Sequence, residues 1–241
     1  MKKAILCIVV YLCSVSAFGQ SPELEKELLN KAWKNGEITA DDAKERVKML
    51  KEIESDYPIL PYDTISGVLN ITRIISFPGV TQLQAFKRMR EWAALNFGSI
   101  DAALNYEDDE SGKLIFKGWT PVWYSATFKN IFGNIKTAAF PEKRELHFSM
   151  VVTVKNARAK VEFKNLRYKH IIAGGISPIT NQYVPTYEYE YPVTAAFPLA
   201  MTPVGTWKGT IDLIKNTMTA LNTFAPSMEK HIRDLISDYD F

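Results

Sequence analysis

Cysteine is almost missing from this chain, and its absence narrows the chemistry that the protein can use. Both cysteines, Cys7 and Cys13, lie within the first twenty residues, so positions 21–241 contain none. That long remainder can form no disulfide and can hold no structural zinc through thiolates. A chain of this length still buries roughly 70–75% of its unfolded surface, so it can fold without covalent cross-links.

An excess of charge of one sign is also missing once the first twenty residues are set aside. The whole chain has 29 Lys and Arg and 27 Asp and Glu; residues 1–20 hold Lys2 and Lys3 and no acid, which leaves 27 of each sign. A general nucleic-acid binder needs a positive field to neutralise phosphates. The neutral balance therefore argues against nucleic acid as a partner.

No apolar run is long enough to span a bilayer. Ala4–Val15 has about a dozen residues, whereas a membrane-spanning helix needs roughly 20. Lys2 and Lys3 precede this run, and small residues such as Gly19 follow it, which is the pattern of a secretory signal. We therefore expect residues 1–20 to be a signal peptide cleaved near Gly19 or Gln20. We expect an exported, periplasmic or envelope-associated protein with no membrane span after cleavage.

Catalytic and cofactor motifs are missing as well. The chain has no Gly-x-Ser-x-Gly elbow, phosphate loop or dinucleotide fingerprint, and its histidines, His147, His170 and His231, lack metal-ligand spacing. The acidic stretch 107–110 lacks the alternating Asp and Asn spacing of a calcium loop, which favours a solvated turn. We expect no cofactor, no metal site and no catalytic residues. A triad assembled from distant residues stays open, because geometry defines such sites.

Residues 21–56 carry the signals of two helices. Ser21 and Thr39 can each cap a helix whose apolar residues recur at helical spacing. The proline-containing segment 57–63 then favours an extended chain. We expect a helical hairpin over 21–56, a linker over 57–63 and a separate domain over 64–241.

The domain expected over 64–241 mixes strand and helix patterns. Thr81 with Gln84 is a capping box that opens a helix ending at Gly98. The clearest hairpin joins His147–Lys155 to Ala159–Arg167, because apolar residues alternate along both strands. We also expect short strands at 102–106 and 113–118, a long excursion at 171–205, an amphipathic helix at 206–222 and a last helix opened by Pro226.

This order of elements favours an α+β fold, because strands and helices do not alternate regularly. The helices at 81–97 and 206–222 each have an apolar stripe that needs an apolar partner. One face of the hairpin at 147–167 supplies it. We therefore expect an antiparallel sheet covered by two helices and preceded by an N-terminal helical hairpin.

Residues 67–170 and the C-terminal helix also carry a recognisable set of packing and turn positions. These are Phe77-Pro78-Gly79-Val80-Thr81, Trp92, Asn96-Phe97, Tyr106-Glu107-Asp108, Gly112-Lys113-Leu114-Ile115 and the strand pair from Phe148 to Tyr168. On them the segment resembles an uncharacterised family of exported Gram-negative bacterial domains with a TATA-binding-protein-like (TBP-like) fold. The resemblance implies a fold and no activity, and the fold's name does not imply DNA binding. Asn156-Ala157 departs from the family, since Asp-Gly is expected at that turn.

A basic strand supplies the first candidate binding surface. Glu162 is the only acidic residue among its six cations. These cations are Lys155, Arg158, Lys160, Lys164, Arg167 and Lys169. Lys160, Glu162 and Lys164 should share the face opposite Val161 and Phe163. Such a face is either the solvated side of an antiparallel sheet or a contact surface for an anionic partner.

A row of aromatic residues supplies the second candidate. Tyr187, Tyr189 and Tyr191 alternate with Glu188 and Glu190, so the three rings should share one strand face. The row can cover the domain as packing, or it can bind sugars or another protein.

The charge of the domain is segregated along the sequence. Residues 101–110 carry five acids and no base, whereas residues 155–170 are mainly basic. The two segments either form a dipole that orients the molecule or pair with each other within one sheet.

These features favour a non-catalytic periplasmic or envelope-associated binding module. The expected partner is an envelope protein or an anionic envelope surface. One alternative is a carrier of a small apolar or lipid-like ligand, held in a helix-covered pocket lined by Trp119, Trp123, Tyr124, Phe128 and Phe132. The other is a hydrolase that acts on envelope polymers.

Overall fold

The computed structural model describes residues 21–58, 60, 62–63, 68–128, 138–176, 181–202 and 206–234. The expected signal segment lies outside these ranges. None of the described helices combines the length and the hydropathy needed to cross a membrane. The chain forms two compact units. The first comprises residues up to Asn70, Tyr124–Glu142 and Thr194–Lys215, and the second comprises Ile71–Trp123, Lys143–Val193 and the chain from Asn216 onward.

The first unit contains the helical hairpin that the sequence predicts. Helices α2 (Pro22–Lys34) and α3 (Ala40–Ile53) are capped by the hydroxyls of Ser21 and Thr39, which accept hydrogen bonds from backbone N–H groups in the first turns. Short elements complete the unit: η1 (Glu54–Asp56), β1 (Tyr62–Asp63), β2 (Val68–Leu69), η2 (Val193–Ala196, which begins at the unit boundary) and η3 (Leu199–Met201).

A six-stranded antiparallel sheet lies mainly in the second unit. Its strands follow the order β10-β7-β6-β5-β4. Strand β3 pairs with the same edge of β7 as β10 does, but along residues 158–163, whereas β10 pairs with residues 167–172. Their bounds are β3 (Ile71–Ser76), β4 (Leu104–Asp108), β5 (Lys113–Phe128), β6 (Ala138–Lys155), β7 (Arg158–Ile172) and β10 (Tyr187–Pro192). The predicted hairpin is the centre of this sheet, and both of its strands run further than the sequence pattern indicated.

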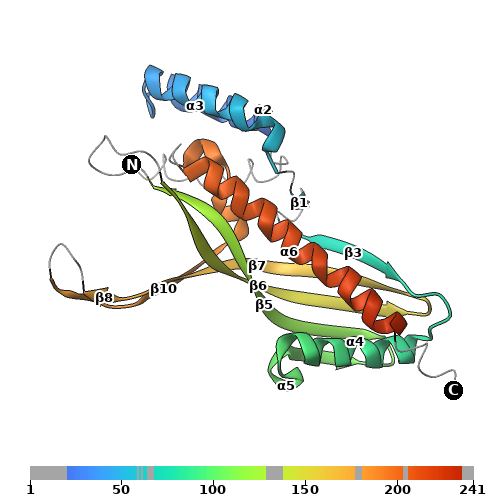
Figure 1. Cartoon of the computed structure of the whole chain (residues 1–241). Helices are drawn as coiled ribbons and strands as arrows, with labels where there is room; N and C mark the ends of the chain where they lie inside the picture. Colours follow the sequence, from blue (N-terminus) through green and yellow to red (C-terminus); the bar gives the residue numbers. More distant parts are fainter. Residues whose placement is uncertain are drawn as a thin grey trace, which may run out of the picture. The chain divides into compact units, whose positions relative to one another are not determined.

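Two helices lie on one face of the sheet. Helix α4 (Gln82–Phe97) opens with the predicted capping box and ends at Gly98, and α6 (Trp207–Asp234) crosses the strands (Figure 1). The Trp92 indole of α4 donates a hydrogen bond to Ser227 of α6 and packs edge-on against Phe224. Phe224 in turn contacts Phe148 and Phe163 of the central strands. The structure therefore confirms the expected α+β arrangement of an antiparallel sheet covered by two helices.

Two local predictions were wrong. Ala102 and Ala103 belong to a short helix, α5 (Ile100–Ala103), rather than to the following strand. Pro226 opens no new helix but lies inside α6, because the buried stripe continues past it to Met228 and Ile232. The excursion after β7, whose order the sequence left open, contains β8 (Gly175–Ile176), which pairs with β9 (Tyr183–Val184), and then β10.

A β-bulge shifts the alternation within β7. Residues 159, 161 and 163 are buried, but after Asn165 the buried positions become 166 and 168. Asn165 has a φ of 54°, and the pairing with β6 shifts register between His147 and Ser149. One extra residue on β7 therefore keeps both Phe163 and Tyr168 on the helix side, where Tyr168 bonds to the buried Thr217 at 2.6 Å.

Candidate functional site

The candidate site is the sheet face opposite α4 and α6. Along β5, Leu114, Phe116 and Val122 are buried toward the helices, so the alternate residues point the other way. Within the second unit, the described residues place no helix over this other face (Figure 1). We call it the uncovered face. Its outward positions are rich in cations and carry several large exposed side chains.

The basic cluster lies on this face, and part of it is neutralised. Lys160 and Lys164 flank Glu162 at 3.1 and 3.5 Å, as the predicted shared face requires. Arg167 pairs with Glu190 at 3.4 Å, and Lys169 pairs with Glu188 at 2.7 Å. The hydrogen bond from Lys169 to Glu188 raises the pKa of that lysine. Both β10 glutamates are therefore engaged by β7.

The Lys160–Glu162–Lys164 group keeps a net positive charge, because two lysines share one carboxylate. Partial burial alone would raise the pKa of Glu162, but its contacts with Lys160 and Lys164 outweigh burial and lower that pKa. Glu162 thus stays ionised at neutral pH, and one positive charge remains on this part of the face.

Lys155 and Arg158 are the least compensated cations of the cluster. They face each other across the hairpin turn, both are exposed, and neither has a carboxylate partner among the described residues. The turn itself is held firmly. The amide of Gln82 at the start of α4 donates to Asn156, and Ala157 exchanges backbone hydrogen bonds with Phe77 and Val80. Lys155 and Arg158 are therefore held at a turn whose backbone is fixed by hydrogen bonds.

The acidic stretch does not neutralise this cluster. Its turn lies next to the basic turn, because the Gln82 side chain donates to the carbonyls of Asp109 and Glu110 while its backbone reaches Asn156. Glu107 instead pairs with Arg90 of α4 at 3.2 Å. Across the described ranges, no ion pair joins the acidic turn to the basic strand.

Two tryptophans project from the uncovered face. Trp119 and Trp123 are 50% and 58% exposed, and Pro121 lies between them on the same side of β5. The exposure of Trp123 contradicts its predicted place in a helix-covered pocket, whereas Trp119 also lines the groove described below. Phe128 and Phe132 lie outside the residues whose side chains are described. The alternation of Leu114, Phe116 and Val122 with Trp119 and Trp123 is a signal that could have found this arrangement.

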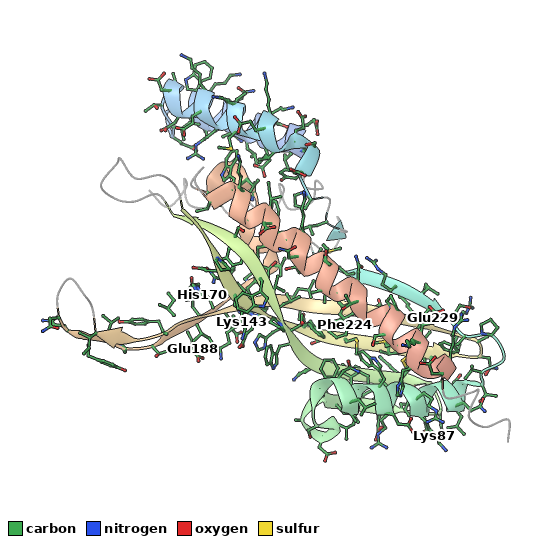
Figure 2. The ribbon with its side chains drawn as sticks, in the orientation of Figure 1. Lys87, Lys143, His170, Glu188, Phe224 and Glu229 are labelled. Atoms are coloured by element: carbon green, nitrogen blue, oxygen red, sulfur yellow. The ribbon has the colours of Figure 1, made fainter. Side chains whose placement is uncertain are left out.

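Polar side chains of β6 surround Trp119. The ring of His147 stacks on it at 6.5 Å between centroids, and the Lys143 ammonium lies 5.7 Å from its centroid. His147 also contacts Glu145, with 3.3 Å between Nε2 and Oε2. Figure 2 shows Lys143 on the strands at the centre of the sheet and Glu188 farther out along β10. Sequence reasoning missed this combination, because it joins two strands.

The tyrosine row lies on the opposite side of the sheet from the basic cluster. Tyr191 packs on the buried Tyr168 at 5.6 Å, and Tyr189 stacks on Tyr191 and bonds to His170 at 2.6 Å. Tyr187 and Tyr189 remain about half exposed. The row therefore begins as core packing and continues as surface, so it belongs to no common site with Lys155 and its neighbours.

The end of β7 and the β8–β9 hairpin that follows it carry further exposed apolar residues. They lie on both faces of a two-stranded ribbon, which sequence reasoning treated only as an excursion. They are Ile171, Ile172, Ile176, Tyr183 and Val184. Such a cluster is unusual for side chains of this size in one short ribbon.

A groove opens at the edge of β5 beyond the end of β4. Its volume is about 550 Å³, and Phe97, Phe224, Lys117 and Trp119 are among the residues that line it. Gly118 forms part of the wall, because a side chain there would collide with the Phe97 ring. The groove is the closest match in the described chain to the ligand pocket that the carrier alternative requires.

The described residues contain no group of three or more His, Cys, Asp or Glu side chains that could hold a metal ion. The three histidines of the chain lie apart from one another on different elements. His147 lies on the uncovered face, His170 bonds to Tyr189, and His231 lies on α6 near Glu91. The site thus offers ion pairing and aromatic contact as its chemistry.

Comparison with known proteins identifies the family of the sheet region. Residues 72–169 match a family described as a domain of unknown function (DUF4468) with TBP-like fold. No curated protein matches the chain. For these residues, the match confirms the resemblance to an uncharacterised family with a TBP-like α+β fold.

Two solved structures are similar to the chain. One is a DUF4468 family protein from Bacteroides ovatus ATCC 8483, with 15% identity over 70% of this chain and 90% of that chain, and a TM-score of 0.41. The other is a TBP-like protein from Parabacteroides distasonis ATCC 8503, with 13% identity over 73% of this chain and 97% of that chain, and a TM-score of 0.44.

Proposed function

Because residues 72–169 match a family of domains of unknown function with a TBP-like fold, we propose a function from the residues themselves. The protein is a non-catalytic binding module that works in the periplasm or at the cell envelope. Its contact surface is the uncovered face of the sheet, and its partner carries negative charge. One observation carries this proposal: helices bury one face of the sheet, whereas the other face carries cations and exposed aromatic rings.

The charge on the uncovered face supports an anionic partner. Lys155 and Arg158 have no carboxylate partner among the described residues, and the single carboxylate of Glu162 forms ion pairs with two lysines. A local positive field on a neutral chain can steer and orient an anionic partner without making the whole protein a general polyanion binder. The acidic turn leaves that field intact, because Glu107 pairs with Arg90.

The environments of the two histidines on the sheet support a non-catalytic role. A general base next to a nucleophile needs that nucleophile within hydrogen-bond reach. His147 instead contacts Glu145, and the hydroxyl that His170 bonds to is the Tyr189 phenol, a group that serves as the nucleophile in few hydrolases. The hydrolase alternative therefore gains no support from either group.

A charge-reversal experiment tests this function. Lys155→Glu with Arg158→Glu changes two exposed cations that belong to no ion pair in the described structure. We expect binding to vesicles with an anionic phospholipid, corrected for binding to zwitterionic vesicles, to weaken by about tenfold or more, since each surface cation contributes about 1 kcal/mol. Binding by the unaltered protein should also fade as salt rises.

The matched control is Lys48→Glu with Lys51→Glu on α3, which makes the same charge change on the helical hairpin. It should leave vesicle binding and the melting temperature unchanged. Equal loss in both double variants would mean that net charge alone governs binding. Unchanged binding in Lys155→Glu with Arg158→Glu would refute the uncovered face as the contact surface.

The groove beside β5 supports a second candidate function, that of a carrier. Its volume of about 550 Å³ lies in the range of small-molecule sites, and Phe97 and Phe224 give it apolar walls. A small lipid-like ligand retained through purification and seen by native mass spectrometry would favour the carrier. Its loss in an Ala102→Trp variant, which adds a bulky side chain at an exposed position of the lining, would place it in the groove.

A further inference from the structure

We infer that Trp119 and Trp123 form a platform for the sugar rings of an acidic glycan, a polymer that contains uronic acid units. The inference rests on the proposed function, since it names the anionic partner of the uncovered face. In this inference the sugar rings stack on the two indole rings, and nearby cations bind the carboxylates of the uronic acid units.

The two rings are held on a rigid support. They occupy alternate outward positions of one strand, so their Cα atoms are about 13 Å apart, at roughly 3.3 Å per residue. The strand is tied to the helix behind it, because the Asn216 amide donates to the carbonyl of Trp123 at 2.8 Å. A fixed spacing of this size spans more than one ring of an extended polymer.

The exposure of these tryptophans points to a ligand. Both rings are at least half exposed, on a face that also carries Lys117 and Lys143. A large aromatic ring contributes stability mainly by burial, so leaving two of them in water forgoes that gain. The C–H face of a pyranose ring matches an indole face in shape and polarity. Stacking of sugar rings would bury surface that the fold leaves open.

The surrounding charges select an acidic sugar polymer. Lys143 lies beside the Trp119 ring, and Lys117 is exposed on the same strand face with no carboxylate partner among the described residues. His147 stacks on Trp119 and can offer a ring N–H. These donors suit carboxylates spaced along a chain. A nucleic acid fits less well, because the chain after residue 20 has no net positive charge to neutralise a phosphate backbone.

The test follows the five indole N–H signals of the full chain by NMR during titration with polygalacturonate, alginate or hyaluronate. The signals of Trp119 and Trp123 should shift and saturate, whereas those of Trp33, Trp92 and Trp207 should stay in place. Trp119→Ala and Trp123→Ala should each weaken binding by about tenfold or more, the loss expected when a central aromatic contact is removed. Trp33→Ala is the matched control, because Trp33 is 49% exposed on a helix of the other unit.

Each other outcome overturns the inference. These outcomes are no binding to any of the three polymers, equal binding to neutral dextran, tighter binding to single-stranded oligo(dT), and movement of the Trp33 signal alone. Dimerisation that depends on Trp119 and Trp123 would assign the platform to a second copy of the chain. If glycan binding survives Trp119→Ala and Trp123→Ala while Lys155→Glu with Arg158→Glu abolishes vesicle binding, the inference fails and the proposed function stands. If neither set of variants has an effect, both fail.

Discussion

At the scale of single residues, Glu25 is the most unusual side chain of the first unit. It is a buried carboxylate that accepts hydrogen bonds of 2.7 Å from the Tyr57 hydroxyl and from the backbone N–H groups of Leu199 and Ala200. Burial raises its pKa, and the three hydrogen bonds lower it only in part. One side chain of α2 thus ties that helix to η3 and to Tyr57, the residue that follows η1.

The raised pKa of Glu25 predicts a pH dependence of the first unit. The folded state favours the protonated carboxyl, so this contribution is complete below the ordinary value of 4.5 and is lost as pH rises through the folded-state pKa. We compare melting temperatures of the unaltered chain and Glu25→Gln, which cannot titrate, from pH 4 to pH 8. Relative to Glu25→Gln, the unaltered chain should lose stability as pH rises.

Glu27→Gln is the control for this titration, because Glu27 is exposed on the same helix. Its melting temperature should follow that of the unaltered chain across the whole range. A constant difference between Glu25→Gln and the unaltered chain would show that Glu25 has the same pKa in the folded and unfolded states.

At the scale of elements, local signals predicted the helices and missed where strands begin and end. Ser21, Thr39 and Thr81 each mark a helix start within one turn of sequence, because a cap acts on its own helix. The lengths of β5 and β6 depend on pairing between distant segments, so periodicity over a few residues did not reveal them. The bulge at Asn165 likewise appears only when β7 is paired with β6.

Pro226 shows how burial overrides a local rule. Proline lacks the N–H that would continue the helix, and in a helix interior it costs about 3 kcal/mol. Helix α6 still continues, because Leu221, Met228 and Ile232 are fully buried on both sides of it. A sequence prediction that weighs only the proline therefore divides one helix into two.

Replacing this proline should stabilise the protein. Pro226 is exposed, so Pro226→Ala restores one hydrogen bond without changing the core, and the free energy of unfolding should rise by up to about 3 kcal/mol in urea denaturation. Thr223→Ala, one turn earlier and also exposed, should gain only a few tenths of a kcal/mol, about the difference in helix propensity. A gain no larger than that of Thr223→Ala would mean that Pro226 causes no strain.

The contact between α4 and β5 gives a second prediction for an element. A Cβ at Gly118 would lie 2.7 Å from one carbon of the Phe97 ring and 3.2 Å from the Phe148 ring. Gly118→Ala should therefore lower the free energy of unfolding by about 1–3 kcal/mol, because overpacking forces the rings apart. Gly175→Ala is the control, since a Cβ there meets no atom within 4 Å. Equal stability of the two variants would contradict this packing.

At the scale of the whole molecule, sequence reasoning predicted the site only in part. The basic strand was visible because its residues are close in sequence, and the structure places Lys160, Glu162 and Lys164 on one face as expected. Partners from other strands were not visible, and they divide the cluster into neutralised and free cations. The grouping of Trp119 with Lys143 and His147 likewise needs two paired strands.

The central claim is that the uncovered sheet face makes the contact with the partner. The chain lacks cysteine after residue 20, so with Cys7→Ser and Cys13→Ser a single new cysteine can carry a bulky label at a chosen place. Thr153→Cys lies on β6 on the uncovered face, opposite Lys160 and two residues before Lys155. Lys87→Cys lies on the exposed side of α4 (Figure 2).

The deciding measurement is the binding of these two labelled chains to anionic vesicles and to polygalacturonate, with their melting temperatures recorded alongside. A label at position 153 should block binding to the vesicles, because Lys155 and Arg158 lie next to it, and the same label at position 87 should leave binding to both probes intact, with both chains equally stable. Full binding to the vesicles with the label at position 153, or equal loss with the label at position 87, would contradict the assignment of the contact surface to the uncovered face.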